Sequence, residues 1–302
     1  MVTEHTKLME KGPSRVSPFF VPMMIVNMAS AVVAIKHGAR GVNLPIVTAC
    51  ATSTNAIGEA FRAIKHGYAD AIIAGGSEAG VQDLCMAGFI NCMALSLSDD
   101  PDRCSIPFDK ERNGFVMGEG AGAVILEDYE HAKARGAHIY CEISGYGNTC
   151  DAYHVTAPDS NAEGSSRLIK LAFDEAGFAP DEQLYINMHG TSTPLNDKTE
   201  TLAVKKALGD LAYKVPTSST KSMTGHMLGA AGAVEAIAVI KALENNFIPP
   251  TIGYREKDEN CDLDYVPNVG REQVINKGIS LSLGFGGHNA GIVFNKLEVR
   301  GS

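Results

Sequence analysis

Residues 46–55 read IVTACATSTN, and the rest of the chain is organised around them. The apolar run from Pro45 predicts a buried strand, and residues 55–66 predict a helix with one buried face. Cys50 lies at the junction, where a sharp turn from strand to helix would expose its sulfur at the end of a sheet. The unpaired N–H groups of the helix would favour the thiolate, and the turn could offer a backbone N–H to an oxyanion.

The order of predicted elements indicates an α/β fold. A short buried strand at residues 71–74 follows the helix and completes a βαβ unit, which implies a parallel sheet covered by helices. The pattern recurs later in the chain, with a strand, a helix and a strand predicted over residues 139–146, 162–176 and 185–188. The sequence therefore predicts two similar halves, residues 1–136 with the cysteine and residues 137–302.

The segments between these units are also assigned from local signals. Three prolines make residues 1–22 an irregular segment, and residues 23–37 predict a helix that Gly38 ends. Residues 99–120, rich in charge and turn formers, predict a long loop that wraps a site. Further elements are a strand over 121–127, helices over 129–135 and 228–243, and strands over 279–283 and 290–294.

Composition excludes several classes of function. The 302 residues carry a formal net charge of −9 without a Lys/Arg cluster, which argues against binding nucleic acid through a basic face. The seven cysteines form no CxxC pair, so we expect reduced thiols in the cytoplasm. The polar start is not a signal peptide, and no uninterrupted apolar run of membrane-spanning length occurs, so no membrane insertion is expected.

Three further stretches carry chemistry. Residues 189–197 read HGTSTPLND and place His189 at the end of a predicted strand, with small hydroxyl side chains after it. Residues 219–226 read STKSMTGH, and Glu235 on the next helix could pair with Lys221. Residues 284–289 read GFGGHN, a glycine run in which Phe285 could swing and offer its N–H. Each stretch also has an ordinary structural interpretation, as a buried cysteine or histidine, a glycine-rich turn or a hairpin loop.

One cysteine with two histidines is consistent with thiol acyl transfer. The thiolate would form an acyl-enzyme, and two imidazole N–H donors could stabilise an enolate or oxyanion. Metal ligation by Cys50, His189 and His226 is the competing interpretation of the same residues. It lacks the local pairing, such as HExxH or CxxC, that metal sites usually show, so we expect no metal.

Taken together, these motifs resemble the β-ketoacyl-acyl carrier protein synthases, most closely the type II condensing enzyme of bacterial fatty-acid synthesis. The resemblance runs from about Ser17 to Asn295 and rests on motifs that occur in the order of the family: TAC at 48–50, HGTSTP at 189–194, KSMTGH at 221–226 with GAAG at 229–232, and GFGG at 284–287, supported by PFDKER at 107–112 and GFVMGEG at 114–120.

The resemblance implies a thiolase-like fold, with two βαβ halves in alternating α and β layers, and a homodimer. It implies that Cys50 accepts the acyl group and that His189 and His226 assist decarboxylation of malonyl-carrier and stabilise the carbanion. Lys221, through Glu235, would hold the charge arrangement of the site.

Five further residues take roles from the same resemblance. The N–H of Phe285 would complete the oxyanion hole with that of Cys50, and its ring would act as a gate. Thr191 and Thr193 would meet the pantetheine arm, Phe115 would lie near the pocket, and Leu283, where an aromatic residue is common in relatives, would bear on pocket shape.

The implied reaction is a decarboxylative Claisen condensation in fatty-acid elongation, with acyl carrier protein as partner. No cofactor is expected, because phosphopantetheine arrives on the carrier. The alternatives are a polyketide ketosynthase and a catalytically silent fragment or partner subunit. A degradative thiolase is disfavoured, since the glycine loop carries His288 and no second cysteine.

The chain departs from the family at its front, where it lacks roughly the first quarter that relatives have. The N-terminal half is therefore expected to be incomplete, with unpaired sheet edges and uncovered apolar faces. We expect the chain expressed alone to be poorly soluble or to need the missing segment as a separate chain. His288, where threonine is frequent, bears on gating of the site.

Overall fold

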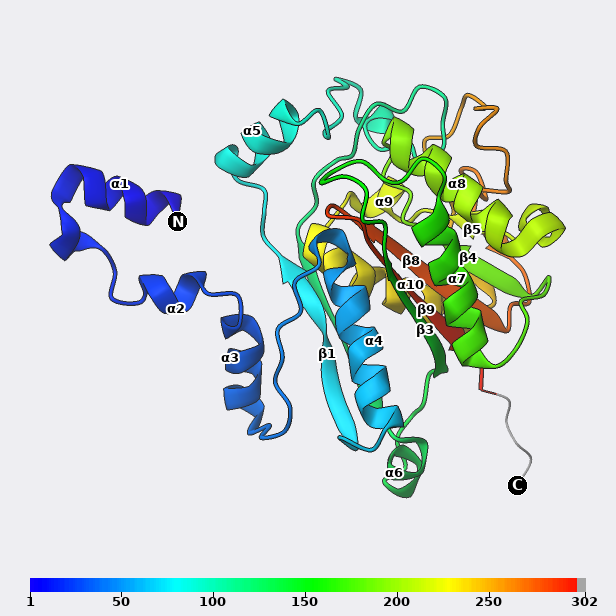
Figure 1. Ribbon diagram of the computed structural model, residues 1–302, viewed down its shortest axis with the longest axis horizontal. Coiled ribbons are helices and arrows are strands. Elements are labelled where there is room, and N and C mark those ends of the chain that lie inside the picture. The colour runs from blue at the N-terminus through cyan, green and yellow to red at the C-terminus, as the bar shows by residue number, and fades with distance from the viewer. Residues whose placement is uncertain (298–302) are drawn as a thin grey trace. The chain divides into compact units, whose positions relative to one another are not determined.

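The computed structural model of the chain describes residues 1–297, which divide into two compact units, residues 1–46 and the chain from Val47 onward. The first unit is helical and contains α1 (Val2–Lys11), α2 (Phe20–Met24) and α3 (Met28–His37) (Figure 1). Gly38 ends α3 in the left-handed conformation, as predicted, because glycine adopts positive φ at little cost. The single helix predicted over residues 23–37 was wrong, because residues 25–27 are not helical and separate α2 from α3.

The prediction that residues 1–22 are irregular was wrong. The ten residues of α1 contain neither proline nor glycine, so nothing interrupts the helix before Gly12 and Pro13. Glu4 in its first turn pairs with Lys7 and accepts a hydrogen bond from the Ser17 N–H at 2.7 Å. Pro13 therefore marks the end of α1, and Pro22 lies in the first turn of α2, where proline is tolerated.

The second unit is built around a five-stranded sheet, in the order β3 (Glu142–Cys150), β9 (His288–Asn295), β8 (Lys277–Gly284), β4 (Leu184–Asn187) and β5 (Thr217–Ser218). β4 runs parallel to both β5 and β8, whereas β9 is antiparallel to both of its neighbours. β8 and β9 form a hairpin that closes at Gly284 and His288. The elements predicted for the second half of the chain are thus all present, with bounds that differ by a few residues.

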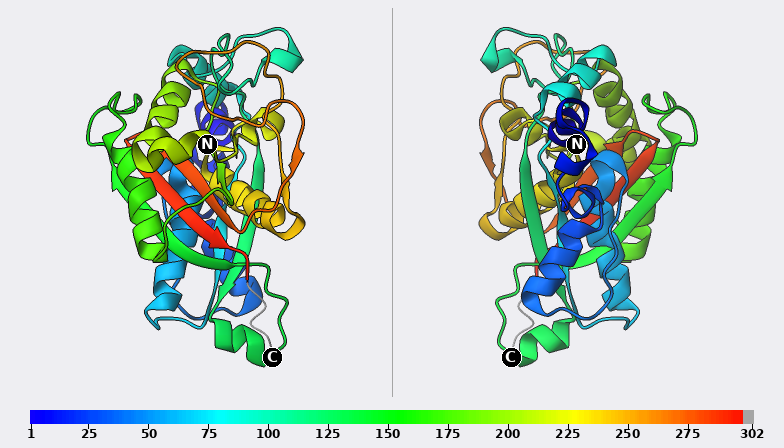
Figure 2. Two further views of the ribbon diagram at one scale, coloured as in Figure 1. Left: turned by 90° about the vertical axis from the view of Figure 1, so that its right-hand side faces the viewer. Right: turned by 90° about the vertical axis from the view of Figure 1, so that its left-hand side faces the viewer.

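Helices and strands alternate in layers within this unit (Figures 1 and 2). α7 (Glu163–Ala176) covers one face of the sheet along β3 and β9, and α8 (Pro194–Leu208) packs beside it. α4 (Thr52–Lys65) and α10 (Ala231–Asn245) contact the other face, and their far sides contact an antiparallel ribbon of β1 (Ala71–Glu78) and β2 (Gly120–Glu127). The remaining elements are α5 (Asp83–Asn91), α6 (Tyr129–Ala134), α9 (Lys221–Thr224) and the ribbon of β6 (Phe247–Ile248) and β7 (Arg271–Glu272).

The strand predicted to end at Ala49 is absent, and so is the βαβ unit built on it. Residues 42–48 have no regular structure, and β1 pairs only with the antiparallel β2 among residues 1–297. A strand exists only where a neighbouring backbone completes its hydrogen-bond ladder, and apolar sequence alone cannot supply that partner. Each strand of the ribbon has one large apolar side chain that is exposed, Ile73 at 46% and Ile125 at 67%.

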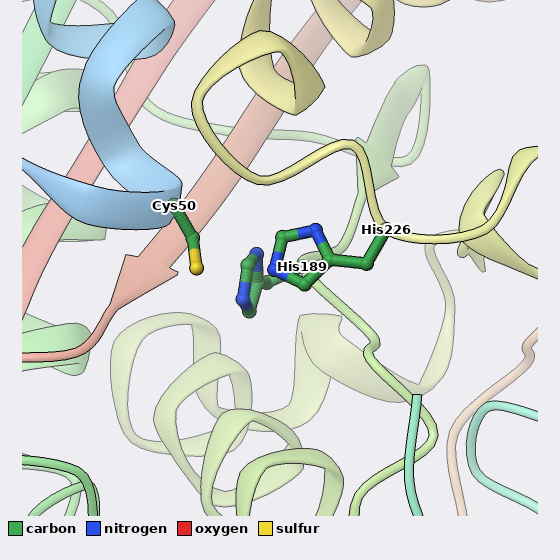
Figure 3. A group of neighbouring side chains, drawn as sticks. All are labelled: Cys50, His189 and His226. Carbon is green, nitrogen blue, oxygen red and sulfur yellow. The ribbon is translucent and has the colours of Figure 1, made fainter. Parts of the chain in front are cut away.

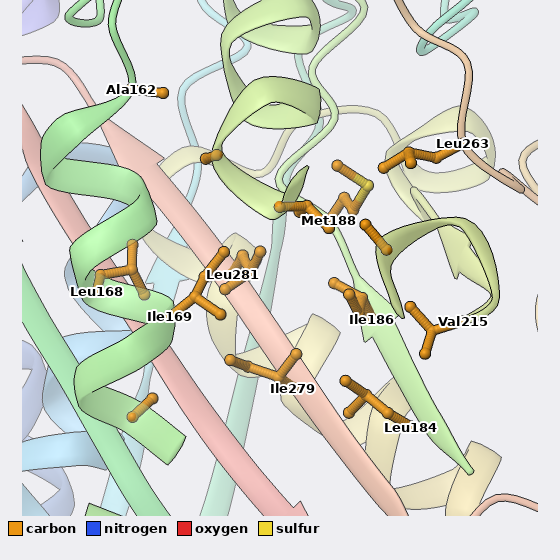
Figure 4. Packing of buried hydrophobic residues seen from close by; sticks show 14 of the residues in the cluster. Ala162, Leu168, Ile169, Leu184, Ile186, Met188, Val215, Leu263, Ile279 and Leu281 are labelled. Atoms are coloured by element: carbon orange, nitrogen blue, oxygen red, sulfur yellow. The ribbon is translucent and has the colours of Figure 1, made fainter. Parts of the chain in front are cut away.

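The main hydrophobic core lies between the sheet and the helices α7 and α8 (Figure 4). Leu168 and Ile169 of α7 meet Ile279 and Leu281 of β8, and every one of these side chains is essentially inaccessible to water. A second core joins α4 and α10 to the strands on either side of them. The two cores hold β4, β8, α4 and α10 in place. The candidate site lies at the C-terminal ends of the two strands and the N-terminal ends of the two helices.

A close approach of α4 and α10 sets the geometry near Cys50. A Cβ atom at Gly232 would lie 1.9 Å from the Thr54 hydroxyl oxygen, so only glycine fits there. The Ser53 hydroxyl accepts the N–H of Ala233 at 2.9 Å, and the Thr54 hydroxyl bonds that of Ser282 on β8 at 2.7 Å. The first turns of the two helices are therefore locked to each other and to the sheet.

Candidate active site

Cys50 lies in a tight 3-10 turn, Ala49–Ala51, directly before α4. Ala49 has φ of +51°, a conformation that costs a non-glycine residue roughly 1–3 kcal/mol and that commonly marks a functional turn. The β8–β9 hairpin comes close to this turn: a Cβ at Gly284 would lie 2.9 Å from the Thr48 carbonyl oxygen and 3.2 Å from the Cys50 nitrogen. The predicted position of the sulfur, at a sharp turn into a helix, is confirmed, although no strand precedes the turn.

The N–H groups of the turn do favour the thiolate, as expected, but burial outweighs them. Burial raises the pKa of the Cys50 thiol from 9.0 to about 11, and the charge of Lys221 together with hydrogen bonds from the backbone N–H groups of Phe285 and Cys50 offsets this only in part. Loss of water outweighs the local N–H groups because a buried anion is costly. Cys50 is therefore a thiol at neutral pH.

His189 lies two residues beyond β4, and its backbone is held by a residue that the sequence analysis missed. The Glu200 carboxylate on α8 accepts the N–H of His189 at 2.6 Å and that of Gly190 at 2.8 Å. Gly190 has φ of +38°, so the chain turns sharply directly after the histidine. Glu200 is buried, which raises its pKa to about 8. Its only signal in the sequence is an acidic residue eleven positions after the histidine.

His226 lies in the loop between α9 and α10. Its N–H donates to the Val116 carbonyl at 2.7 Å, and its carbonyl accepts the Gly118 N–H at 2.9 Å, so the loop predicted to wrap a site contacts it directly. Phe115 packs edge-on against the His226 ring, with 5.1 Å between ring centroids. The Nδ1 atom of His226 is buried and has no hydrogen-bond partner among residues 1–297.

The structure brings the three predicted residues together (Figure 3). One donor atom from each of Cys50, His189 and His226 lies within 4.8 Å of the other two, and the histidine rings meet edge to face at 5.2 Å. Burial, followed by the charge of Lys221, lowers the pKa of both histidines well below 6.5. The site therefore presents one thiol and two neutral imidazoles.

Lys221, the first residue of α9, forms the predicted ion pair with Glu235 of α10, and both side chains are nearly fully buried. The Lys221 Nζ also lies 3.3 Å from His189 Nδ1. An ammonium can only donate, so Nδ1 accepts and the proton of the neutral ring lies on Nε2. Lys221 thereby makes His189 Nε2 a hydrogen-bond donor.

Phe285 occupies the turn of the β8–β9 hairpin, between Gly284 and the left-handed Gly286 and Gly287. Its ring is 37% exposed and lies 6.5 Å from that of Phe89. The backbone N–H groups of Phe285 and Cys50 both act on the Cys50 sulfur. Two converging N–H donors are the arrangement that stabilises an oxyanion formed at that sulfur.

The remaining predicted residues take different positions. The hydroxyls of Thr191 and Thr193 bond each other at 2.9 Å directly after His189, with Thr191 buried and Thr193 partly exposed. Phe115 lies against His226, as described above. Leu283 is buried at the end of β8, within the main core.

Buried charges fix the loop at 99–119 to α8. The Asp197 carboxylate accepts the Phe108 N–H at 2.8 Å and lies 3.5 Å from Arg112 Nε. Arg112 also pairs with Asp258 at 2.6 Å. These contacts, which sequence reasoning did not identify, place the end of the loop against His226.

Comparison with known proteins agrees with the geometry. The beta-ketoacyl synthase N-terminal domain model matches residues 2–132, and the C-terminal domain model matches residues 140–255. The chain is 53% identical over 296 residues to 3-oxoacyl-[acyl-carrier-protein] synthase 2 of Synechocystis sp., covering 98% of this chain and 71% of that protein. It is 52% identical to the protein of the same name from Staphylococcus aureus, covering 97% of this chain and 71% of the relative.

Solved structures give the same assignment. A type II PKS ketosynthase in complex with its acyl-carrier protein matches with a TM-score of 0.94 and 39% identity, covering 98% of this chain and 74% of that one. A beta-ketoacyl synthase from Burkholderia phymatum matches with a TM-score of 0.92 and 34% identity, covering 98% and 72%. The chain belongs to the β-ketoacyl synthase family and has its thiolase-like fold.

Proposed function

We propose that this chain carries the 3-oxoacyl-[acyl-carrier-protein] synthase reaction of fatty-acid elongation. The observation that carries the proposal is the convergence of Cys50, His189 and His226 within 4.8 Å, next to two backbone N–H donors. A nucleophile and a separate pair of neutral imidazole donors fit a reaction that needs both an acyl-enzyme and a stabilised carbanion.

In the first half-reaction the Cys50 sulfur attacks the thioester carbonyl of an acyl-carrier. The new S–C bond forms while the carbonyl oxygen becomes an oxyanion facing the N–H groups of Cys50 and Phe285. The C–S bond to the carrier then breaks, and the proton of the Cys50 thiol leaves with the pantetheine sulfur. Since Cys50 is a thiol in the free protein, its proton departs only when the substrate is in place.

In the second half-reaction malonyl-carrier loses CO₂ and leaves an enolate whose oxygen needs hydrogen-bond donors. His189 Nε2–H is such a donor, because Lys221 occupies Nδ1. The carbanion attacks the carbonyl of the acyl-enzyme, the bond to the Cys50 sulfur breaks, and the thiolate takes up a proton. The product is a 3-ketoacyl-carrier.

Fatty-acid elongation is favoured over a polyketide reaction by relatedness. The chain is 52–53% identical to the two 3-oxoacyl-[acyl-carrier-protein] synthase 2 proteins and 39% identical to the type II PKS ketosynthase. A profile of the acyl chain lengths accepted, with saturated against polyketide primers, separates the two.

The remaining expectations are part of the proposal. The partner is an acyl carrier protein, as in the type II PKS complex among the structural relatives. The protein acts as a homodimer in the cytoplasm and needs no metal or redox cofactor. Within residues 1–297, no helix has both the length and the apolar character to span a membrane.

Acylation of Cys50 is the direct test. The chain is incubated with acyl-carrier, and intact-mass and peptide analysis locate any acyl group. We expect one acyl group on Cys50, none on a Cys50→Ser variant and an unchanged amount on a Cys85→Ser variant, which removes an exposed cysteine. Absence of acylation in the wild-type chain would support a silent fragment, and acylation at another cysteine would refute the assigned nucleophile.

A further inference from the structure

The donor set at the active site is also one that a thiophilic divalent metal ion prefers. Cys50 offers a sulfur, and His189 and His226 each offer a ring nitrogen. In a tetrahedral zinc site, bonds of about 2.0–2.3 Å place such donors roughly 3.3–3.6 Å apart. From the present limit of 4.8 Å the donors would need to approach one another by up to about 1.5 Å, which side-chain rotation can supply.

The hydrogen-bond partner of His189 disfavours metal binding at this site. A metal-bound histidine normally donates its second N–H to a carboxylate or carbonyl oxygen, which leaves the other nitrogen free to ligate. Here the partner of Nδ1 is the ammonium of Lys221 at 3.3 Å, a donor. The ring proton therefore lies on Nε2, which is the one ring nitrogen that Lys221 leaves to a metal ion, and the charge of Lys221 lies beside the ring.

The position of that ammonium is set by burial and by one carboxylate. Lys221 and Glu235 are 1% and 3% exposed, and they form an ion pair that bridges α9 and α10. The ammonium cannot swing into solvent without leaving Glu235 buried and unpaired. The ion pair therefore holds the ammonium beside His189 Nδ1.

We propose that Lys221, held by Glu235, keeps thiophilic divalent metal ions out of the site formed by Cys50, His189 and His226. The inference rests on the donor geometry and does not depend on the proposed reaction. The pair of Lys221 and Glu235 would thus determine which ligands can bind: with metal ions excluded, the thiol and both imidazoles remain available to a thioester substrate. Replacing Lys221 by a neutral hydrogen-bond acceptor should convert the same three side chains into a metal site.

Cobalt(II) is the probe, because a thiolate ligand gives it a charge-transfer band and a tetrahedral site gives it intense visible bands. The purified chain is titrated with Co²⁺ as wild type and as Lys221→Gln, whose amide oxygen can accept the Nδ1 proton of His189. Binding releases the Cys50 thiol proton to the buffer as the S–Co bond forms. We expect the variant to bind one Co²⁺ roughly 10–100-fold more tightly than wild type, so that the thiolate band reaches half its intensity at a correspondingly lower Co²⁺ concentration.

Three controls define the site. Lys205→Gln removes a lysine that is paired with Asp262 away from the three donors, and it should bind cobalt as wild type does. Lys221→Gln combined with Cys50→Ser should lose the thiolate band. Lys221→Gln combined with Glu235→Gln removes the unpaired carboxylate, so it tests the same conversion if the single variant is unstable.

A thiolate–cobalt band of equal affinity in the wild-type chain would overturn the proposal, whatever the variants do. So would a folded Lys221→Gln variant, single or double, that gains no affinity, or a gain that persists without Cys50. Acylation of Cys50 in the wild type is measured separately, so failure of the metal experiment and failure of the proposed reaction are distinguishable.

Discussion

The Glu200 carboxylate offers the sharpest test of how the site is held. It accepts the N–H groups of His189 and Gly190, one on each oxygen. In a Glu200→Gln variant one carboxylate oxygen is replaced by an NH₂ group. This group is a hydrogen-bond donor, and it would face the backbone N–H of either His189 or Gly190, which is also a donor. One N–H keeps its acceptor, and the other is left buried without one.

The expected loss follows from these two bonds. An ordinary hydrogen bond contributes about 0.5–1.5 kcal/mol, and a buried N–H left without an acceptor costs about 1–3 kcal/mol. Partial relaxation of the turn makes the expected destabilisation about 3 kcal/mol. For a chain of 302 residues, this lowers the melting temperature by roughly 5 °C. The condensation rate should fall as well, because the turn that aims His189 loses one of its two anchors.

The pH dependence gives a second readout with a definite sign. Burial raises the pKa of Glu200 from 4.5 to about 8. Between these values the folded chain holds a proton that the unfolded chain has released, so this carboxyl makes wild-type stability fall as pH rises from about 5 to 8. Glutamine does not titrate, so the free energy of unfolding of the variant lacks this dependence on pH. The difference in unfolding free energy between wild type and variant should therefore become smaller from pH 5 to pH 8.

The assay is thermal and denaturant unfolding of both proteins from pH 5 to 8, with the condensation rate measured alongside. Glu182→Gln is the matched control, because this glutamate is exposed and its pair with Lys214 at 3.1 Å is a surface contact. The control should change stability by less than about 0.5 kcal/mol. The anchoring role would be refuted by a Glu200→Gln variant that has the melting temperature and denaturant midpoint of the wild type and the same condensation rate.

Three further outcomes follow from the structure. Alkylation of Cys50 by iodoacetamide should rise about tenfold per pH unit up to pH 10, because burial raises its pKa to about 11; a plateau below pH 8 would contradict this. Gly232→Ala should lower the denaturant midpoint, since its Cβ would lie 1.9 Å from the Thr54 hydroxyl, whereas Gly88→Ala, with open space around it, should not. Ile125→Thr should raise solubility without changing acylation of Cys50, because this side chain is 67% exposed on the ribbon; equal aggregation would count against the uncovered face.

Much of the chemistry was readable in the sequence because it depends on local patterns. The cysteine before a helix, the histidine after a strand and the lysine–histidine loop each reside in a short segment, and their order along the chain indicated the family. The pairing of Lys221 with Glu235 was also predicted, from its place at the start of the next helix, and is confirmed. Apolar spacing together with segment length and flanking glycines identified the helices and strands of the second half.

Other features depended on contacts between distant residues. Residues 46–49 look like a buried strand, yet a strand needs a neighbour to complete its ladder, and none pairs with them in the described chain. The pKa of Cys50 moved against the local expectation, because burial by the surrounding fold outweighs the N–H groups of one turn.

No sequence motif pointed to Glu200. It contacts His189 and Gly190 only because α8 packs against the turn that follows β4. The sequence by itself determined which side chains this protein brings to its chemistry. Only the tertiary structure decided the proton on His189, the protonation of Cys50 and the anchors of the site, because hydrogen-bond partners and exclusion of water are properties of packed elements.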